Sequence, residues 1–217
     1  MLSQVRVVTV VSLPFYENSY LAWRDDERTC LVFDPGLEPD LIFEELDRRQ
    51  LRPAAILNTH GHADHIAGNA AMKERWPDCP LVIGEHEADK LSDPIGNLSG
   101  IFGTPLVSPA ADETVRDGQQ YSVGGFEFLV REIPGHSSGH VVFISQVDRP
   151  MIVFGGDILM AGSVGRTDFP DGDFDALAQG IREKLYTLPD DTVVYPGHGE
   201  PTTIGHEKVT NPFVRGV

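Results

Sequence analysis

Three histidines and one aspartate fall within residues 59–65, Thr-His-Gly-His-Ala-Asp-His, as His60, His62, Asp64 and His65. Imidazole and carboxylate are the side chains that bind zinc, iron and manganese well at neutral pH. The spacing does not suit one face of a helix, because His60 and His62 would point to nearly opposite sides, whereas positions i and i+4 share a face. A loop leaving a strand could direct all four side chains into one cavity. This stretch therefore predicts a metal site rather than a polar surface loop that happens to be rich in histidine.

Three further glycine-containing turns present a histidine or an aspartate after an apolar run. They are Pro134-Gly-His136, Gly155-Gly-Asp157 and Pro196-Gly-His198. Glycine permits the tight backbone that aims a side chain into a shared cavity. A single histidine such as His136 would more often be structural, but the recurrence favours ligation. Seven potential ligands suit two metal ions, each with about three protein ligands and room for water.

The elements that must position these turns follow from periodicity. Apolar or alternating runs predict strands over 4–13, 18–23, 29–33, 53–58, 81–84, 119–133, 141–145, 151–154 and 193–195. Amphipathic spacing predicts helices over 39–51, 64–76, 85–91, 173–187 (with Asp173 or Asp171 as its cap) and 204–209. The segment Ser92–Ala111 is rich in Gly, Pro and Ser and predicts a long surface loop bordering the site. Strands alternating with helices indicate the α/β class, in which ligands commonly lie beyond the carboxyl ends of strands.

Composition excludes several classes of function. The 217 residues, 23.8 kDa in mass, carry a formal charge of −16, which argues against binding nucleic acid or anionic lipid, since both need basic surface. No apolar run approaches the ~20 residues that span a bilayer, and Met1–Leu13 shows no export signal. Cys30 and Cys79 lie far apart without metal-ligand spacing and are expected to be buried thiols, not a disulfide. We therefore expect a cytoplasmic protein.

The motifs resemble those of metallo-β-lactamase-fold hydrolases and, within them, of the glyoxalase II-like branch. The matching segments occur in the family's order over nearly the whole chain: 59–65, 134–136, 156–157 and 196–198, with further likeness at 18–20, 34–36 and 162–168. The resemblance implies a four-layer αβ/βα sandwich, in which two mixed β-sheets pack between outer helices. It also implies that residues 1–217 form a single domain.

The resemblance divides the seven ligands into two sets. The first set is His60, His62 and His136, and the second is Asp64, His65 and His198. Asp157 is expected to bridge the two. It implies two divalent ions, zinc or else iron or manganese, which share a water and turn it into an attacking hydroxide. Asp64 is expected also to orient that water, alongside the bridging Asp157, as a catalytic residue. Arg166 is expected to contact a glutathione carboxylate, because a guanidinium pairs with a carboxylate through two bonds. A structural salt bridge is the alternative for Arg166.

Five other polar residues are expected to play lesser parts. Asp34 and Asp168 lie in turns, where they are expected to support the ligands at most. His86, His140 and His206 match no motif and are expected to be structural or surface residues.

The implied activity is hydrolysis of a small-molecule thioester, S-D-lactoylglutathione above all, to D-lactate and glutathione. The closest rival is a persulfide dioxygenase of the same fold, which would hold one iron at His60, His136 and Asp157 and which shares the segment 165–169. A rival of another class is a non-catalytic metal-binding module, which would close its metal site with four ligands. Full-length glyoxalase II carries a helical C-terminal extension, whereas about nineteen residues follow His198, as in the short form. Lactonase and β-lactamase activities are less favoured.

Overall fold

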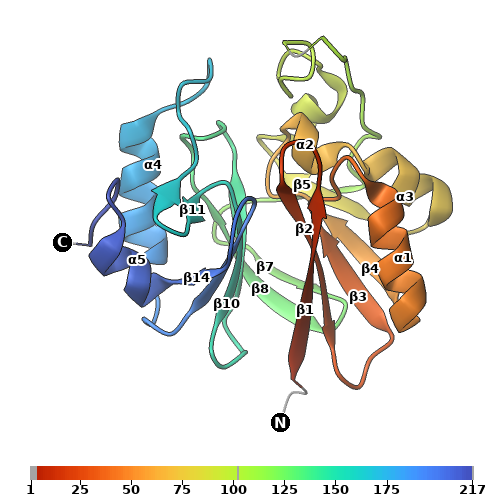
Figure 1. Ribbon diagram of the computed structural model, residues 1–217, viewed down its shortest axis with the longest axis horizontal. Helices are drawn as coiled ribbons and strands as arrows, with labels where there is room; N and C mark the ends of the chain where they lie inside the picture. The colour runs from red at the N-terminus through yellow and green to blue at the C-terminus, as the bar shows by residue number, and fades with distance from the viewer. Residues whose placement is uncertain (1–3, 102, 217) are drawn as a thin grey trace.

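Two six-stranded β-sheets face each other, and helices cover the outer side of each sheet (Figure 1). The computed structural model describes residues 4–101 and 103–216. The first three residues of the N-terminal stretch and residue 102 of the predicted loop therefore lie outside the described residues, as does residue 217. The layers confirm the predicted αβ/βα sandwich.

The first sheet is mixed and has the order β1-β2-β3-β4-β5-β6. Its first three strands pair antiparallel and the rest pair parallel. Its strands are β1 (Val5–Ser12), β2 (Glu17–Arg24), β3 (Thr29–Phe33), β4 (Arg52–Leu57), β5 (Leu81–Gly84) and β6 (Glu113–Val115). Its outer face packs on α1 (Pro39–Arg49) and α3 (Asn69–Arg75) through a cluster that includes Ile42, Leu46 and Met72. A four-residue helix, α2 (Ala63–Ile66), precedes α3.

The second sheet is also mixed and has the order β14-β13-β10-β9-β8-β7. Its strands are β7 (Gln120–Val123), β8 (Phe126–Glu132), β9 (Val141–Ser145), β10 (Ile152–Gly156), β13 (Val193–Pro196) and β14 (Thr202–Thr203). Its outer face packs on α4 (Phe174–Gly180), the π-helical turn η2 (Ile181–Leu185) and α5 (Ile204–Thr210) through apolar side chains that include Leu177, Ile181 and Ile204. A separate two-stranded ribbon consists of β11 (Leu159–Met160) and β12 (Ser163–Val164).

Aromatic side chains join the two sheets. Phe33 of the first sheet stacks on Phe154 of the second, with ring centroids 3.8 Å apart and planes at 11°. Phe128 and Phe143 meet the Phe33 ring edge-on, at 6.0 and 5.7 Å. All four rings are buried, and burying a phenyl side chain stabilises a fold by about 1.5–3 kcal/mol. This core fixes the distance between the sheet ends where the histidine turns lie.

Three predicted elements differ from the structure. The helix expected over 64–76 is two helices, α2 and α3, because the Gly68 amide donates to the Pro35 carbonyl (2.8 Å) and a Cβ at Gly68 would lie 2.8 Å from the Gly36 oxygen. The strand expected over 119–133 is a hairpin that turns at Gly124 and Gly125, where φ is 56° and 78°. The helix expected over 85–91 is a 3₁₀ turn, η1 (Ala88–Ser92).

The remaining helix predictions hold with small changes. The predicted cap of the helix over 173–187 is confirmed, because Asp173 Oδ1 accepts a hydrogen bond from the Ala176 amide (3.0 Å). That helix ends as the π-helical turn η2. The short strands β6, β11, β12 and β14 were not predicted.

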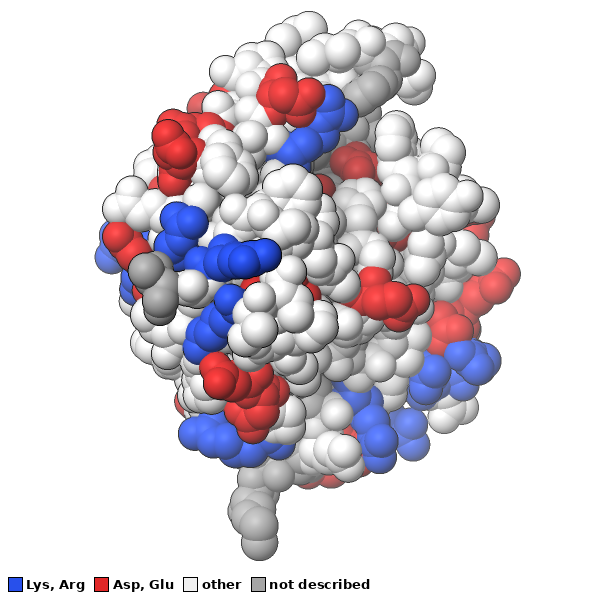
Figure 2. Space-filling view, turned by 60° about the vertical axis from the view of Figure 1, so that its left-hand side comes forward, with Lys and Arg blue, Asp and Glu red and all other residues white. Residues whose placement is uncertain are grey.

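The surface and the thiols agree with the composition. Lys and Arg side chains alternate with Asp and Glu side chains over the face shown in Figure 2, and no patch of one sign covers it. Cys30 and Cys79 are buried and unbridged, as expected. Among the helices of residues 4–101 and 103–216, none is long and apolar enough to cross a membrane.

Candidate metal centre

The histidine-bearing turns converge because of strand direction. In the second sheet, β9 runs antiparallel to β8 and to β10, and β10 runs parallel to β13. The carboxyl ends of β8, β10 and β13 therefore lie at one edge, where they deliver His136, Asp157 and His198. The turn after β4 brings the 59–65 loop from the first sheet to the same place.

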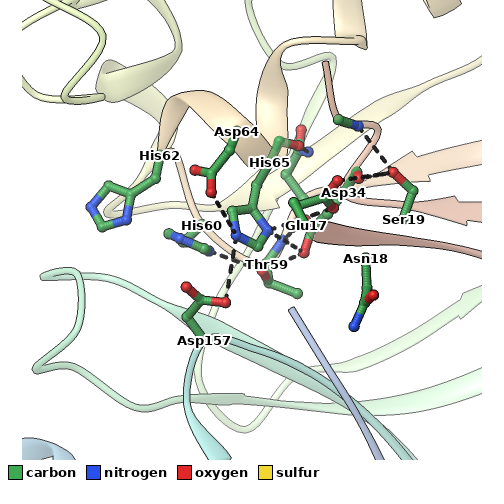
Figure 3. Close-up of polar contacts among 12 residues, drawn as sticks. Glu17, Asn18, Ser19, Asp34, Thr59, His60, His62, Asp64, His65 and Asp157 are labelled. Atoms are coloured by element: carbon green, nitrogen blue, oxygen red, sulfur yellow. Dashed lines mark hydrogen bonds and ion pairs between the residues drawn. The ribbon is translucent and has the colours of Figure 1, made fainter. Parts of the chain in front are cut away.

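The structure brings all seven predicted ligands together. Potential ligand atoms lie within 4.8 Å of one another in three groups: His60, His62 and His136; His60, His65 and Asp157; and Asp64, His65 and His198. The first and third groups are the two sets that the resemblance implied. Each set combines side chains from both sheets. Figure 3 shows the His65 ring between the carboxylates of Asp64 and Asp157, with a dashed line to each.

Asp157 lies between the two sets. Its Oδ2 is 3.4 Å from His136 Nε2 and 3.4 Å from His198 Nε2, while its Oδ1 is 3.5 Å from His65 Nε2. Asp64 Oδ2 is 3.5 Å from His198 Nε2. A carboxylate in this position reaches both ligand sets, which is the geometry that a bridging ligand requires.

The donor atoms fit metal ions. His60 Nε2, His65 Nε2 and Asp157 Oδ1 are buried and make no hydrogen bond within the described residues. A buried polar atom without a partner costs about 1–3 kcal/mol, and metal ions held by the two ligand sets would satisfy all three. Imidazole nitrogens and carboxylate oxygens are donors for zinc, iron and manganese. The residues present therefore fit two divalent ions.

A contact on Nδ1 fixes the orientation of four of the histidine rings and leaves Nε2 directed at the centre. The partners are Thr59 Oγ1 for His60 (3.1 Å), Asp34 Oδ2 for His65 (3.1 Å), the Arg166 carbonyl for His136 (2.9 Å) and the Tyr16 carbonyl for His198 (3.2 Å). Such contacts set the tautomer and strengthen the ligand. Asp34 is thus a supporting residue, as expected, and it also accepts hydrogen bonds from the amide and the hydroxyl of Thr59, both at 2.7 Å.

The histidines of the cluster differ in their protonation. Burial lowers the pKa of His60 well below its ordinary value and brings the pKa of His62 to about 3, so both rings are neutral at pH 7. Burial also opposes charge on His65 and His198, but neighbouring carboxylates outweigh it; they raise the pKa of His65 and bring the pKa of His198 to about 10. Burial raises the pKa of Asp157, yet the charge on His65 and the close contacts of the His198 and His65 rings hold it well below its usual range.

Two residues contribute more than the sequence indicated. His140, expected to be structural or on the surface, is buried; its ring stacks on His60 at 4.5 Å and its Nε2 accepts a hydrogen bond from the Asp157 amide (3.1 Å). Glu17 was not singled out from the sequence, because nothing in its local sequence marks it, but its buried Oε1 lies 4.0 Å from His65 Nδ1. His86 and His206 are exposed, as expected.

A cavity of about 660 Å³ opens over the centre. Apolar side chains dominate its wall: Pro14, Phe15, Leu37, Leu98, Leu106, Met160, Val164 and Phe169. The predicted loop 92–111 supplies Leu98 and Leu106, so it borders the site. Arg166 also lines the cavity, but its Nε and one terminal nitrogen each donate to Asp168 at 2.6 Å. The structure therefore pairs Arg166 and Asp168 with each other.

The two-sheet sandwich, with two His/Asp ligand sets at the sheet ends, defines a metallohydrolase class. The chain belongs to the metallo-β-lactamase superfamily, which matches residues 13–198. It is 36% identical over 203 residues to hydroxyacylglutathione hydrolase GloC of Haemophilus influenzae, covering 92% of this chain and 93% of that protein.

Two solved structures agree with this assignment. The BLEG-1 B3 metallo-beta-lactamase has a TM-score of 0.92 at 36% identity, covering 97% of this chain and 100% of that one. TTHA1623, solved in a di-iron-bound form, has a TM-score of 0.83 at 34% identity, covering 95% of this chain and 100% of that one. The family resemblance and the fold drawn from the sequence are confirmed.

Proposed function

We propose that residues 1–217 form one domain that hydrolyses small-molecule thioesters with two divalent metal ions, and that S-D-lactoylglutathione is its leading substrate. One observation carries the proposal: two ligand sets, with Asp157 between them, lie beneath a cavity large enough for a thioester. The name of the Haemophilus relative supports the substrate class. The di-iron form of TTHA1623 supports two ions, and the donor types suit zinc as well as iron or manganese.

The chain's own residues would divide the work. Two ions held by the ligand sets would supply Lewis acidity, which lowers the pKa of water and polarises the substrate carbonyl. Asp64 lines the cavity and is partly exposed, so it is placed to accept a hydrogen bond from the attacking water and orient it. Asp157, which lies between the two ligand sets, would contribute to both. Arg166, at the cavity wall, would meet a carboxylate of the thiol carrier.

The apolar wall has a second role in this proposal. Because Leu98, Leu106 and Phe169 surround the centre, they would exclude bulk water once a substrate is bound.

The two unbridged thiols, Cys30 and Cys79, support a cytoplasmic location, since reducing compartments keep cysteines free.

The test follows thioester absorbance of S-D-lactoylglutathione with metal-replete protein, a chelated sample and Asp157→Ala. Metal-dependent hydrolysis that Asp157→Ala abolishes, together with its bound metal, supports the proposal. Absence of hydrolysis by metal-replete protein overturns the substrate. Oxygen uptake with glutathione persulfide would then favour the mononuclear iron dioxygenase. The non-catalytic module would be favoured if removal of the metal unfolds the protein and the metal-replete protein is inactive in both assays.

A further inference from the structure

A buried glutamate outside the ligand sets joins the two loops that carry the first set. Glu87, in the turn between β5 and η1, is 0% exposed. Its Oε2 accepts a hydrogen bond from the Gly61 amide (2.8 Å), and its Oε1 accepts one from the Gly139 amide (2.7 Å). Gly61 lies between His60 and His62, so a single carboxylate holds the histidine loop and the loop after β8 at a fixed separation.

The same carboxylate meets two further donors. Its Oε1 also accepts hydrogen bonds from the Ser137 hydroxyl (2.7 Å) and from the Lys90 ammonium (2.9 Å). Ser137 directly follows the ligand His136. Four donors on one buried carboxylate satisfy its lone pairs and, with the cation, offset the cost of removing its charge from water.

Lys90 links this network to a third loop, the one that carries Asp171. Its ammonium donates to Asp171 Oδ2 (2.6 Å) and contacts the Ser137 hydroxyl. Asp171 Oδ2 in turn accepts a hydrogen bond from the Ser138 amide (3.0 Å). Lys90 is largely buried, with 13% of its side chain exposed, so water screens these contacts weakly.

The loops are also packed too tightly against this segment to shift freely. A Cβ at Gly61 would lie 2.7 Å from the Cβ of Lys90, and a Cβ at Gly139 would lie 2.5 Å from the Cβ of His86. None of the hydrogen bonds found for Glu87 or Lys90 within residues 4–101 and 103–216 reaches Asp64, His65 or His198. The bonds of the network therefore go to residues next to or near His60, His62 and His136, and none found within the described residues goes to a residue next to Asp64, His65 or His198.

We propose that Glu87 and Lys90 form a positioning pair that sets the metal affinity of the His60/His62/His136 set and not that of the Asp64/His65/His198 set. The inference rests on the proposed metal sites. Glu87→Gln tests it, because glutamine keeps the shape but has one acceptor oxygen, so either the Gly61 or the Gly139 amide loses its acceptor. We expect the first set to bind its ion about 10- to 100-fold more weakly, the range for partners one contact removed from a ligand.

The two sets are measured separately in two backgrounds. His198→Ala disables the second set and His136→Ala disables the first, and cobalt(II) binding is followed by visible absorption in competition with a chelator. Glu87→Gln is expected to weaken binding in the His198→Ala background and to leave the His136→Ala background within about twofold. Lys90→Met is expected to act on the same set, and it decides the matter if Glu87→Gln does not fold.

Glu207 provides a matched control. It is also 0% exposed and accepts hydrogen bonds from the Gly162 amide, the Thr202 hydroxyl and the Asn211 amide group, at 3.0, 2.6 and 2.8 Å. None of these partners adjoins a ligand, so Glu207→Gln is expected to lower stability without changing either cobalt affinity. Equal weakening of both sets by Glu87→Gln, or weakening of the first set by Glu207→Gln, overturns the inference. If the parent protein binds two ions and neither Glu87→Gln nor Lys90→Met changes their affinity, the inference is overturned and the proposed function stands. If the parent protein binds no ions, both are overturned.

Discussion

His65 Nδ1 lies 3.1 Å from Oδ2 of Asp34, whose other oxygen accepts a hydrogen bond from the Thr59 amide. One carboxylate thus fixes the start of the histidine loop and the tautomer of a ligand six residues further on. A carboxylate acceptor keeps the proton on Nδ1 and leaves Nε2 free to bind a metal ion.

Asp34→Asn is expected to weaken metal binding by the Asp64/His65/His198 set about 10- to 100-fold. The asparagine oxygen can still accept the Thr59 amide, but its NH₂ group then faces His65 Nδ1. The ring must accept that bond and move its own proton to Nε2, where it blocks ligation. Chelator competition measures the affinity. Asp173→Asn serves as the control, since asparagine caps a helix as well as aspartate does; an Asp34→Asn affinity equal to that of this control would refute the role.

Metal binding by the second set is expected to release protons and to strengthen as pH rises. Carboxylate contacts bring the pKa of His198 to about 10 and raise that of His65, so both rings carry a second proton and a positive charge at pH 7 in the metal-free protein. An ion must displace these protons. The affinity therefore increases with pH until the folded-state pKa values are passed. Titration calorimetry in buffers of different ionisation enthalpy counts the protons, and a heat independent of buffer would contradict this expectation.

The same raised pKa affects the stability of the metal-free protein. Because the folded-state pKa of His198 exceeds the unfolded value near 6.5, its contribution is fully present below that value. It is lost as pH rises through about 10. Unfolding of chelated protein at several pH values measures this loss.

Opposite changes in the Michaelis constant are expected from the two members of the Arg166–Asp168 pair. Arg166→Ala removes the guanidinium that would bind a substrate carboxylate, so KM for an anionic thiol conjugate should rise about 10- to 100-fold, far more than kcat falls. Asp168→Asn frees the guanidinium from its 2.6 Å contacts, so KM should fall. An uncharged thioester, assayed alongside, should show neither change. A KM that Arg166→Ala leaves unaltered would assign this arginine to a structural salt bridge.

Loss of the aromatic contact between the sheets is expected to destabilise the protein strongly. Phe33→Ala removes a buried ring that stacks on Phe154, and such substitutions cost about 3–5 kcal/mol. Urea unfolding of chelated protein gives the free energy. Val209→Ala is the control, because that side chain is 74% exposed and its loss should stay within about 0.5 kcal/mol. A loss below about 1 kcal/mol for Phe33→Ala would mean that the core closes over the gap.

Much of the fold and of the candidate metal site could be predicted from the sequence, because both depend on local sequence patterns. Apolar runs predicted the long strands, and the glycine turns after them predicted where His136, Asp157 and His198 lie. The structure brings these side chains together, while their binding of metal remains a prediction.

The features that were missed depend on distant contacts. Strands of two or three residues, such as β14, carry no periodic signal and exist through pairing with neighbours. The break between α2 and α3 is set by the contact of Gly68 with Pro35 and Gly36. Glu17 and Glu87 resemble any surface glutamate in sequence, since burial of a charged side chain depends on the partners that surround it.

Each ligand set draws side chains from both sheets, which has a kinetic consequence. The first set takes His60 and His62 from the loop after β4 and His136 from the loop after β8. An ion held there would act as a cross-link between the halves of the sandwich. The sheets could then separate only after the ion had dissociated, so the lifetime of the native state would follow the rate of metal release, even where the equilibrium stability of the chain alone is modest.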